Sequence, residues 1–154
     1  MTTDSYTQRE CQSLLCESLL GRGSSRSVYT TNILPGYVVK VEDASRSFNN
    51  VLEWEVWRKI YDKPISKWFA PCWEISASGG ILIQVRTKPI ESGDKLPKRI
   101  PECLTDTHIA NFGWYEGRVV CHDYGFHAIL NSIVKSKLTD AKLWRGMTPG
   151  RKKT

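Results

Sequence analysis

The fold is decided by the stretch LTDTHIANFGWYEGRVVCHDYG, residues 104–125. Asp106 stands five residues before Asn111, and Asp123 opens an Asp-Tyr-Gly sequence further on. Residues 118–121 between them are typical of a short strand, so Asn111 and Asp123 bracket a predicted hairpin and can converge. Phosphoryl transfer needs one carboxylate that orients the attacking hydroxyl. It also needs hard oxygen ligands for Mg²⁺, which an amide and a second carboxylate can supply.

These motifs resemble the catalytic half of the protein-kinase-like superfamily. The resemblance implies that Asp106 is the catalytic-loop aspartate and that Asn111 and Asp123 bind the metal, with Tyr124 in place of the Phe of Asp-Phe-Gly. The form Asp-x-His-x-x-Asn, with His108, is closer to the aminoglycoside- and choline-kinase-like branches than to typical eukaryotic protein kinases, which carry Lys there.

A second motif lies at residues 21–29, GRGSSRSVY, where two glycines and a polar tip predict a hairpin whose turn can approach a ligand closely. Backbone N–H groups at such a turn can cover phosphates. The resemblance makes this the family's glycine-rich loop, with Arg26 in place of its third glycine. The predicted ATP-contacting residues are Gly21, Gly23, Ser24, Ser25 and Val28. A tight hairpin turn with no ligand is the alternative interpretation.

Residues 37–42, YVVKVE, alternate as a half-buried strand that carries Lys40. The resemblance implies that Lys40 contacts the α- and β-phosphates of ATP. Residues 46–61 are predicted to form an amphipathic helix on which Glu53 can face inward. Glu53 is the expected partner of Lys40, and Glu55 is the alternative.

The remaining pattern completes an α+β fold class. Residues 69–76 and 81–87 are predicted strands joined by a Ser-Gly-Gly turn, and residues 126–138 are a predicted helix. Residues 8–20 are expected to begin as a helix that docks on the core, although their last residues could open a first strand. We therefore predict a protein-kinase-like fold in a single minimal domain over 1–139. It has an antiparallel five-stranded sheet with one helix (about 18–88) and a reduced helical second lobe (about 89–139), and a basic tail (140–154) follows.

Charge and composition limit the classes of partner. The net charge is +6, and the seven cations and one aspartate in residues 135–154 account for all of it. A broad nucleic-acid-binding face is therefore not expected, and the tail is the only candidate. No apolar run is long enough to span a membrane, and the five irregularly spaced cysteines fit reduced thiols, so a cytoplasmic protein is expected.

A zinc site is the competing interpretation of the histidines. Borderline and soft ligands occur in two clusters, but no Cys-x-x-Cys pair is present and the aspartates would go unused. The residues concerned are Cys103, His108, Cys121, His122 and His127.

The predicted function is ATP- and Mg²⁺-dependent phosphoryl transfer to a hydroxyl, with a Ser/Thr protein kinase acting on a host protein or on itself as the leading form. In its small size the chain resembles compact kinase-like proteins of bacteriophages. The alternative is a catalytically inactive, pseudokinase-like protein that inhibits a host factor. Arg26, the Leu104 that stands where the family has His, and the lack of an activation segment favour that alternative. The complete ordered set of ionic groups opposes it.

Overall fold

The computed structural model describes residues 2–43, 47–141 and 144–147. The chain divides into two compact units, Met1–Val51 with Cys72–Arg86 and Leu52–Pro71 with Thr87–Thr154. Residues 52–71, expected in the first lobe, therefore cluster with the second unit. Within the described ranges, no helix is long and apolar enough to cross a membrane.

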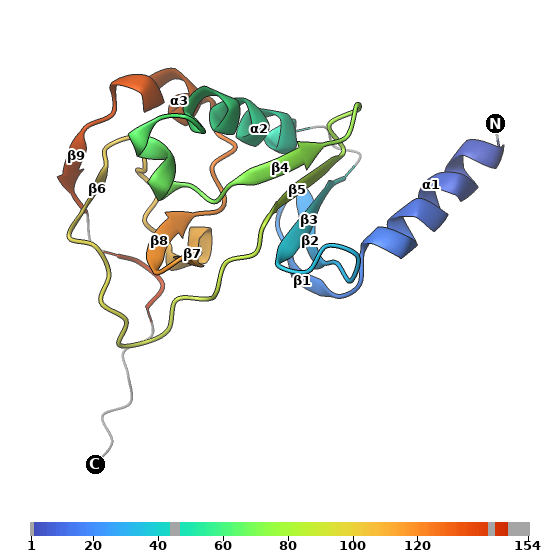
Figure 1. Cartoon of the computed structure of the whole chain (residues 1–154), viewed down its shortest axis with the longest axis horizontal. Helices are drawn as coiled ribbons and strands as arrows, with labels where there is room; N and C mark the ends of the chain where they lie inside the picture. Colours follow the sequence, from blue (N-terminus) through green and yellow to red (C-terminus); the bar gives the residue numbers. More distant parts are fainter. Residues whose placement is uncertain (1, 44–46, 142–143, 148–154) are drawn as a thin grey trace, which may run out of the picture. The chain divides into compact units, whose positions relative to one another are not determined.

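The first unit is built on a five-stranded antiparallel sheet in the order β1-β2-β3-β5-β4 (Figure 1). The expected antiparallel five-stranded sheet is thus confirmed. Its strands are β1 (Leu19–Arg22), β2 (Arg26–Thr30), β3 (Tyr37–Glu42), β4 (Cys72–Ile75) and β5 (Ile81–Val85). The last two are shorter at their ends than predicted.

Strand β3 lies between β2 and β5, and it is more deeply buried than its alternating sequence predicts. Val38, Val39 and Lys40 are all buried, so both faces of the strand are covered at this point. The half-buried assignment was therefore wrong for the middle of the strand, because successive side chains point to opposite faces and three successive residues are buried there.

Helix α1 (Thr2–Leu15) precedes the sheet. It begins and ends earlier than predicted, and Leu19 and Leu20 open β1, as the alternative interpretation had it. The expected docking on the core is not observed: Leu14 is 70% exposed, and Figure 1 shows α1 running clear of the sheet. Apolar residues at helical spacing are therefore not sufficient evidence that α1 packs against the sheet.

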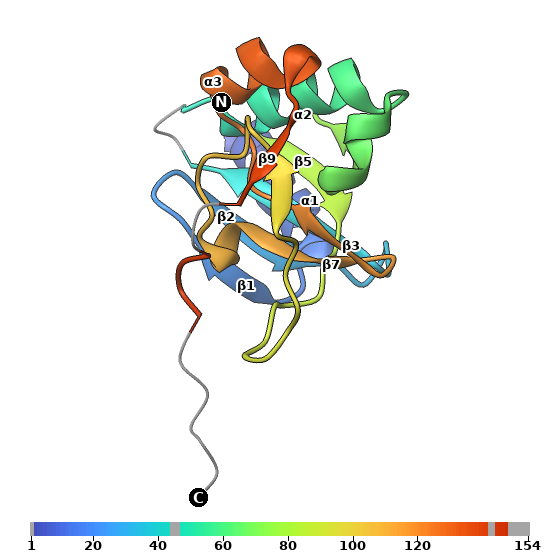
Figure 2. The ribbon, with the colours of Figure 1, turned by 90° about the vertical axis from the view of Figure 1, so that its left-hand side faces the viewer.

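The second unit combines short strands and helices. Most of α2 (Asn49–Ile60) belongs to it, followed by the 3₁₀ helix η1 (Pro64–Trp68). Two antiparallel pairs come next along the chain, β6 (Arg99–Pro101) with β9 (Leu138–Asp140) and β7 (Phe112–Tyr115) with β8 (Arg118–Cys121). Figures 1 and 2 show α3 (His127–Ser132) beside α2, and Lys59 Nζ of α2 donates to the Leu130 carbonyl at 3.4 Å.

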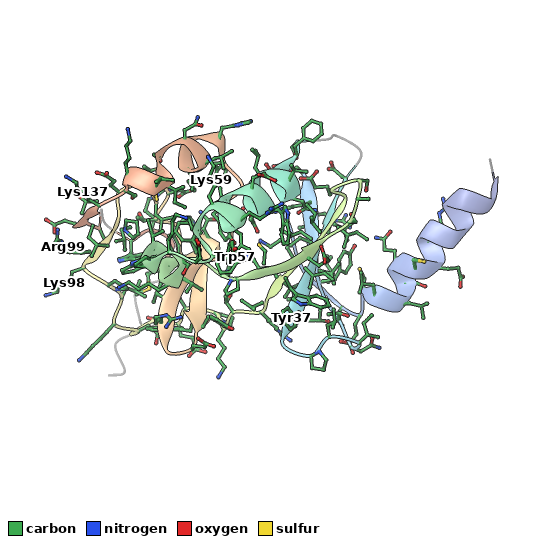
Figure 3. All side chains as sticks on the ribbon, turned by 45° about the horizontal axis from the view of Figure 1, so that its top comes forward. Tyr37, Trp57, Lys59, Lys98, Arg99 and Lys137 are labelled. Carbon is green, nitrogen blue, oxygen red and sulfur yellow. The ribbon has the colours of Figure 1, made fainter. Side chains whose placement is uncertain are left out.

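The predicted helix over residues 126–138 was too long. Helix α3 ends at Ser132, the 3₁₀ helix η3 (Ile133–Lys135) follows, and Leu138 already belongs to β9. The ladder of β9 with β6 connects residues about 40 positions apart, and this non-local pairing decides the conformation at the end of the predicted helix. Lys98, Arg99 and Lys137 extend outward from this pair in Figure 3.

Candidate active site

The β7–β8 hairpin brings the two predicted metal ligands together. Its turn residues Glu116 and Gly117 have φ angles of 48° and 74°, the left-handed pair that favours a tight two-residue hairpin. Phe112 pairs with Cys121 at the open end of the hairpin, and His122 N donates to the Asn111 carbonyl at 2.8 Å. Asn111 therefore stands immediately before the hairpin and Asp123 two residues after its end.

Asp106, Asn111 and Asp123 line one cavity of about 300 Å³ in the second unit. Its remaining wall is largely apolar, with Leu104, Cys121 and Ile129 buried. The lining residues are Leu104, Thr105, Asp106, Asn111, Cys121, Asp123, Phe126, Ala128 and Ile129. An apolar pocket with a few convergent polar groups is the usual form of a ligand site.

Asp106 is held in its ionised form by its neighbours. Burial raises the pKa of its carboxyl, but hydrogen bonds from the His108 N–H, the Asn111 amide and Arg145 lower it, and the net pKa lies below the ordinary value. An ionised carboxylate accepts hydrogen bonds only, so the Asn111 side chain donates through its nitrogen. Its Oδ1 is then left as an acceptor.

The Asp-Tyr-Gly segment is anchored from two sides within the second unit. The Tyr124 N–H donates to Glu53 Oε2 at 3.1 Å, and the Tyr124 hydroxyl donates to the Ala70 carbonyl at 2.7 Å. The Tyr124 ring is fully buried and packs edge-on against Phe69 at 5.0 Å. The phenol oxygen thus has a buried partner, which explains how Tyr is accommodated at this position.

Glu53 is fully buried, whereas Glu55 is exposed. Of the two candidate partners for Lys40, Glu53 is therefore the one that faces inward. Lys40 is also buried, at 3% exposure, but belongs to the first unit, whereas Glu53 belongs to the second. Their pairing stays a prediction.

The predicted glycine-rich loop is a tight turn between β1 and β2. Gly23 N donates to the Arg26 carbonyl at 2.8 Å, and Gly21 pairs with Val28. Gly21, Gly23 and Ser24 are exposed, whereas Ser25 is buried and its hydroxyl accepts from the Asn49 side chain at 2.7 Å. The hairpin common to both interpretations is present.

Arg26 and Asn50 form a buried polar cluster that the sequence did not reveal. Arg26 Nη1 donates to Asn50 Oδ1 at 3.1 Å, and Asn50 Nδ2 donates to the carbonyls of Lys40 and Gly79 at 3.0 and 3.1 Å. Asn50 N also donates to Glu42 Oε1 at 2.7 Å. Arg26 is therefore bonded to the same Asn50 side chain that holds the Lys40 carbonyl.

Two of the three histidines, His108 and His122, form hydrogen bonds with main-chain groups. His122 Nε2 donates to the Ala110 carbonyl at 2.7 Å, which leaves Nδ1 to accept from the Thr87 hydroxyl at 2.8 Å. His108 Nδ1 accepts from Ala110 N at 3.1 Å. In the part of the chain that the structure describes, no three His, Cys, Asp or Glu side chains gather as a metal site, which contradicts the zinc interpretation with Cys103, Cys121 and His127.

The donor set of the cavity fits Mg²⁺ better than zinc. Mg²⁺ is bound by few protein oxygens and retains several waters or phosphate oxygens, so it does not need three protein ligands. Asn111 Oδ1 and the Asp123 carboxylate are the two oxygen donors that would hold it. The bound ion would neutralise the phosphates of a nucleotide.

Arg145 is the residue at this site that sequence reasoning missed. Its guanidinium forms an ion pair with Asp106 Oδ1, although it was assigned to the basic tail. Trp144 packs edge-on against Phe112 at 4.9 Å, and its indole N–H donates to the Pro97 carbonyl at 3.1 Å. Residues 142–143 and 148–154 of the tail lie outside the described residues.

No protein-family model matches the chain, and no curated protein matches it.

Proposed function

We propose that this protein is a minimal member of the protein-kinase-like superfamily that transfers the γ-phosphoryl group of ATP to a hydroxyl. The observation that carries the proposal is the single cavity lined by Asp106, Asn111 and Asp123. These are the three groups that the sequence motif assigns to one reaction, and two of them come from opposite ends of a hairpin.

The chemistry assigns each group one role. Asp106, ionised and at the cavity wall, orients the acceptor hydroxyl and takes its proton. Asn111 and Asp123 hold the metal, and the hydrogen bond from Asn111 to Asp106 fixes the spacing between the two functions. In the first unit, Lys40 is the proposed ligand of the α- and β-phosphates, and the loop over Gly21, Gly23, Ser24, Ser25 and Val28 is proposed to cover them. Glu53, which belongs to the second unit, remains the predicted partner of Lys40.

The acceptor that we propose is a Ser/Thr hydroxyl of a host protein or of the chain itself, in the cytoplasm. The small size of the whole chain favours a protein acceptor, because a large partner can supply surface that a small domain lacks. The basic residues near β6 and β9, including Lys98 and Lys137, are exposed and favour an acidic partner surface.

Titration with Mg²⁺ tests the metal role directly. Transfer of labelled γ-phosphate is followed as Mg²⁺ is raised, in wild type, Asn111→Ala and Asp123→Asn. Both variants are expected to lose at least 100-fold in rate or to need much more Mg²⁺, as expected when preorganised charge is removed. Asp140→Asn is the matched control, because that aspartate is exposed on β9. Wild-type metal dependence in both site variants would refute the assignment.

A further inference from the structure

The C-terminal strap, defined as residues 138–141 and 144–147, is attached to the second unit along its length. Strand β9 pairs with β6, and Ala141 N donates to the Lys98 carbonyl at 2.7 Å. Trp144 then contacts Phe112 and the Pro97 carbonyl. The strap is therefore part of the folded unit and not a loosely held end.

Backbone bonds place Arg145 beside the Asp106 loop. Arg145 N donates to the Thr107 carbonyl at 3.1 Å, and the Arg145 carbonyl accepts from Ile109 N at 2.9 Å. The next residue, Gly146, has φ of +84°, and a Cβ there would lie 2.7 Å from Cε1 of the His108 ring. A glycine lets the strap lie against His108, so the position of Arg145 is set by main chain on both sides.

The cavity itself is rich in negative charge. Asp106 and Asp123 line it, and none of the described residues in its wall is Lys or Arg. A transferring phosphoryl group adds further negative charge, which phosphoryl-transfer sites neutralise with cations besides the metal. Arg145 forms an ion pair with Asp106, and its side chain is 61% exposed. Its guanidinium therefore has N–H donors besides the one that Asp106 accepts from.

We propose that Arg145 is a further catalytic residue, a cation supplied in cis by the C-terminal strap to the phosphoryl group in transfer. The proposal rests on the proposed function. An acceptor hydroxyl that is hydrogen-bonded to Asp106 would lie close to the Arg145 guanidinium, because both groups bind the same carboxylate. Arginine supplied in cis or in trans stabilises the charge of such transition states in other phosphoryl-transfer enzymes.

The acceptor oxygen forms a bond to the γ-phosphorus while the bond from that phosphorus to the β–γ bridging oxygen breaks. The hydroxyl proton passes to Asp106, and ADP leaves with the electron pair. Arg145 keeps its protons and donates hydrogen bonds to the equatorial oxygens of the phosphoryl group.

The strap could instead be an inhibitory segment that occupies the acceptor position at Asp106. A segment that mimics the acceptor must leave Asp106 before each reaction, but the strap is also tied at β9, at Ala141 and at Trp144. Removing all of these contacts in every catalytic cycle is unfavourable compared with a movement of the Arg145 side chain alone. The attachments therefore favour a permanent cation over a displaceable inhibitor.

The test compares steady-state γ-phosphate transfer by the full chain in wild type, Arg145→Gln, Arg145→Lys and Arg145→Ala. Arg145→Gln is expected to lower kcat about 100-fold or more with a small change in the KM for ATP, and Arg145→Lys to keep part of the rate. Millimolar guanidinium is expected to restore transfer in Arg145→Ala, which a merely structural role would not allow. Arg118→Gln is the control, because Arg118 is an exposed arginine of the same unit that faces Glu116 at 3.5 Å.

The outcomes separate the two proposals. Transfer by Arg145→Gln at the wild-type rate, or faster as expected of a blocking strap, would overturn the role of Arg145 and leave the proposed function standing. Absence of transfer by the wild type itself would overturn the proposed function and the role of Arg145 with it. Should Arg145→Gln fold poorly, as judged by its melting temperature, Arg145→Lys and the guanidinium rescue decide the question.

Discussion

The Tyr124 N–H donates a hydrogen bond of 3.1 Å to Glu53 Oε2, between two residues that are both fully buried. The bond links helix α2 to the Asp-Tyr-Gly segment and lies next to Asp123. A buried carboxylate is tolerated only when its oxygens have partners. The residue expected to pair with Lys40 is therefore bonded directly to the expected metal-binding segment.

Glu53→Ala is expected to destabilise the protein by about 3 kcal/mol, because the Tyr124 N–H loses its acceptor in a buried setting. Urea unfolding measures the loss. Glu55→Ala, at an exposed position of the same helix, is the control and is expected to change stability by less than about 0.5 kcal/mol. Equal effects of the two substitutions would contradict the buried role of Glu53.

Tyr124→Phe separates stability from function. The variant leaves the buried Ala70 carbonyl without its 2.7 Å partner, so a loss of about 1 to 3 kcal/mol is expected in thermal or urea unfolding. The aromatic ring and the Asp123 backbone stay in place, so transfer at low temperature is expected to remain. Tyr61→Phe, whose residue is 62% exposed, serves as the control and should leave stability unchanged.

Asn50→Ala is expected to weaken the first unit by about 2 to 4 kcal/mol. The substitution removes one acceptor of the Arg26 guanidinium and the two hydrogen bonds that the Asn50 amide donates to buried main-chain carbonyls. Asn32→Ala, at an exposed position of the same unit, is the comparison. Hydrogen exchange of the β3 amides should rise in Asn50→Ala alone, and unchanged protection there would contradict the role of the cluster.

Gly146→Ala tests the course of the strap against a control with the same backbone conformation. Gly36 has a φ of +85°, close to the +84° of Gly146, but a Cβ at Gly36 meets nothing within 4 Å. Both alanines carry the strain of positive φ, about 1 kcal/mol, and only Gly146→Ala adds a collision with the His108 ring. Gly146→Ala should therefore cost more in urea unfolding and should also reduce transfer. Equal costs would mean that the strap does not lie against His108.

Asp94 gives the second unit a pH-dependent contribution to stability. Hydrogen bonds from the Glu91 N–H at 2.9 Å and the Trp114 indole at 2.7 Å lower the pKa of its carboxyl below 3.8. The contribution is then fully present above the unfolded pKa and is lost as pH falls through the lower folded pKa. The stability difference between wild type and Asp94→Asn should shrink from pH 7 to pH 3. A difference that is constant or grows toward acid pH would contradict this assignment.

Local patterns predicted the parts of the structure that local interactions determine. The residues of β3 follow from alternation, residues 118–121 were predicted as the strand that forms β8, and the inward position of Glu53 follows from helical spacing. The chain order of the motifs also indicated which side chains would meet in the cavity, because a hairpin brings its two ends together.

Contacts between distant residues could not be predicted in the same way. The end of α3 depends on the pairing of β9 with β6, and the Arg145 contact joins residues 39 positions apart, in a segment whose charge alone indicated a solvated tail. Asparagine is a residue type that often caps helices, and Asn50 lies near the start of α2. Its buried side chain instead donates to the main-chain carbonyls of Lys40 and Gly79. Such roles depend on the assembled fold and leave no periodic signal.

Transfer of labelled γ-phosphate from ATP and Mg²⁺, by wild type beside Asp106→Ala, tests the central claim most directly. Each protein is incubated alone and with a host-cell lysate, and labelled proteins are separated and identified. Label in the chain or in a lysate protein with wild type only is the predicted result, and the labelled residue would identify the acceptor. No label with wild type, or equal label with Asp106→Ala, would contradict phosphoryl transfer at this site.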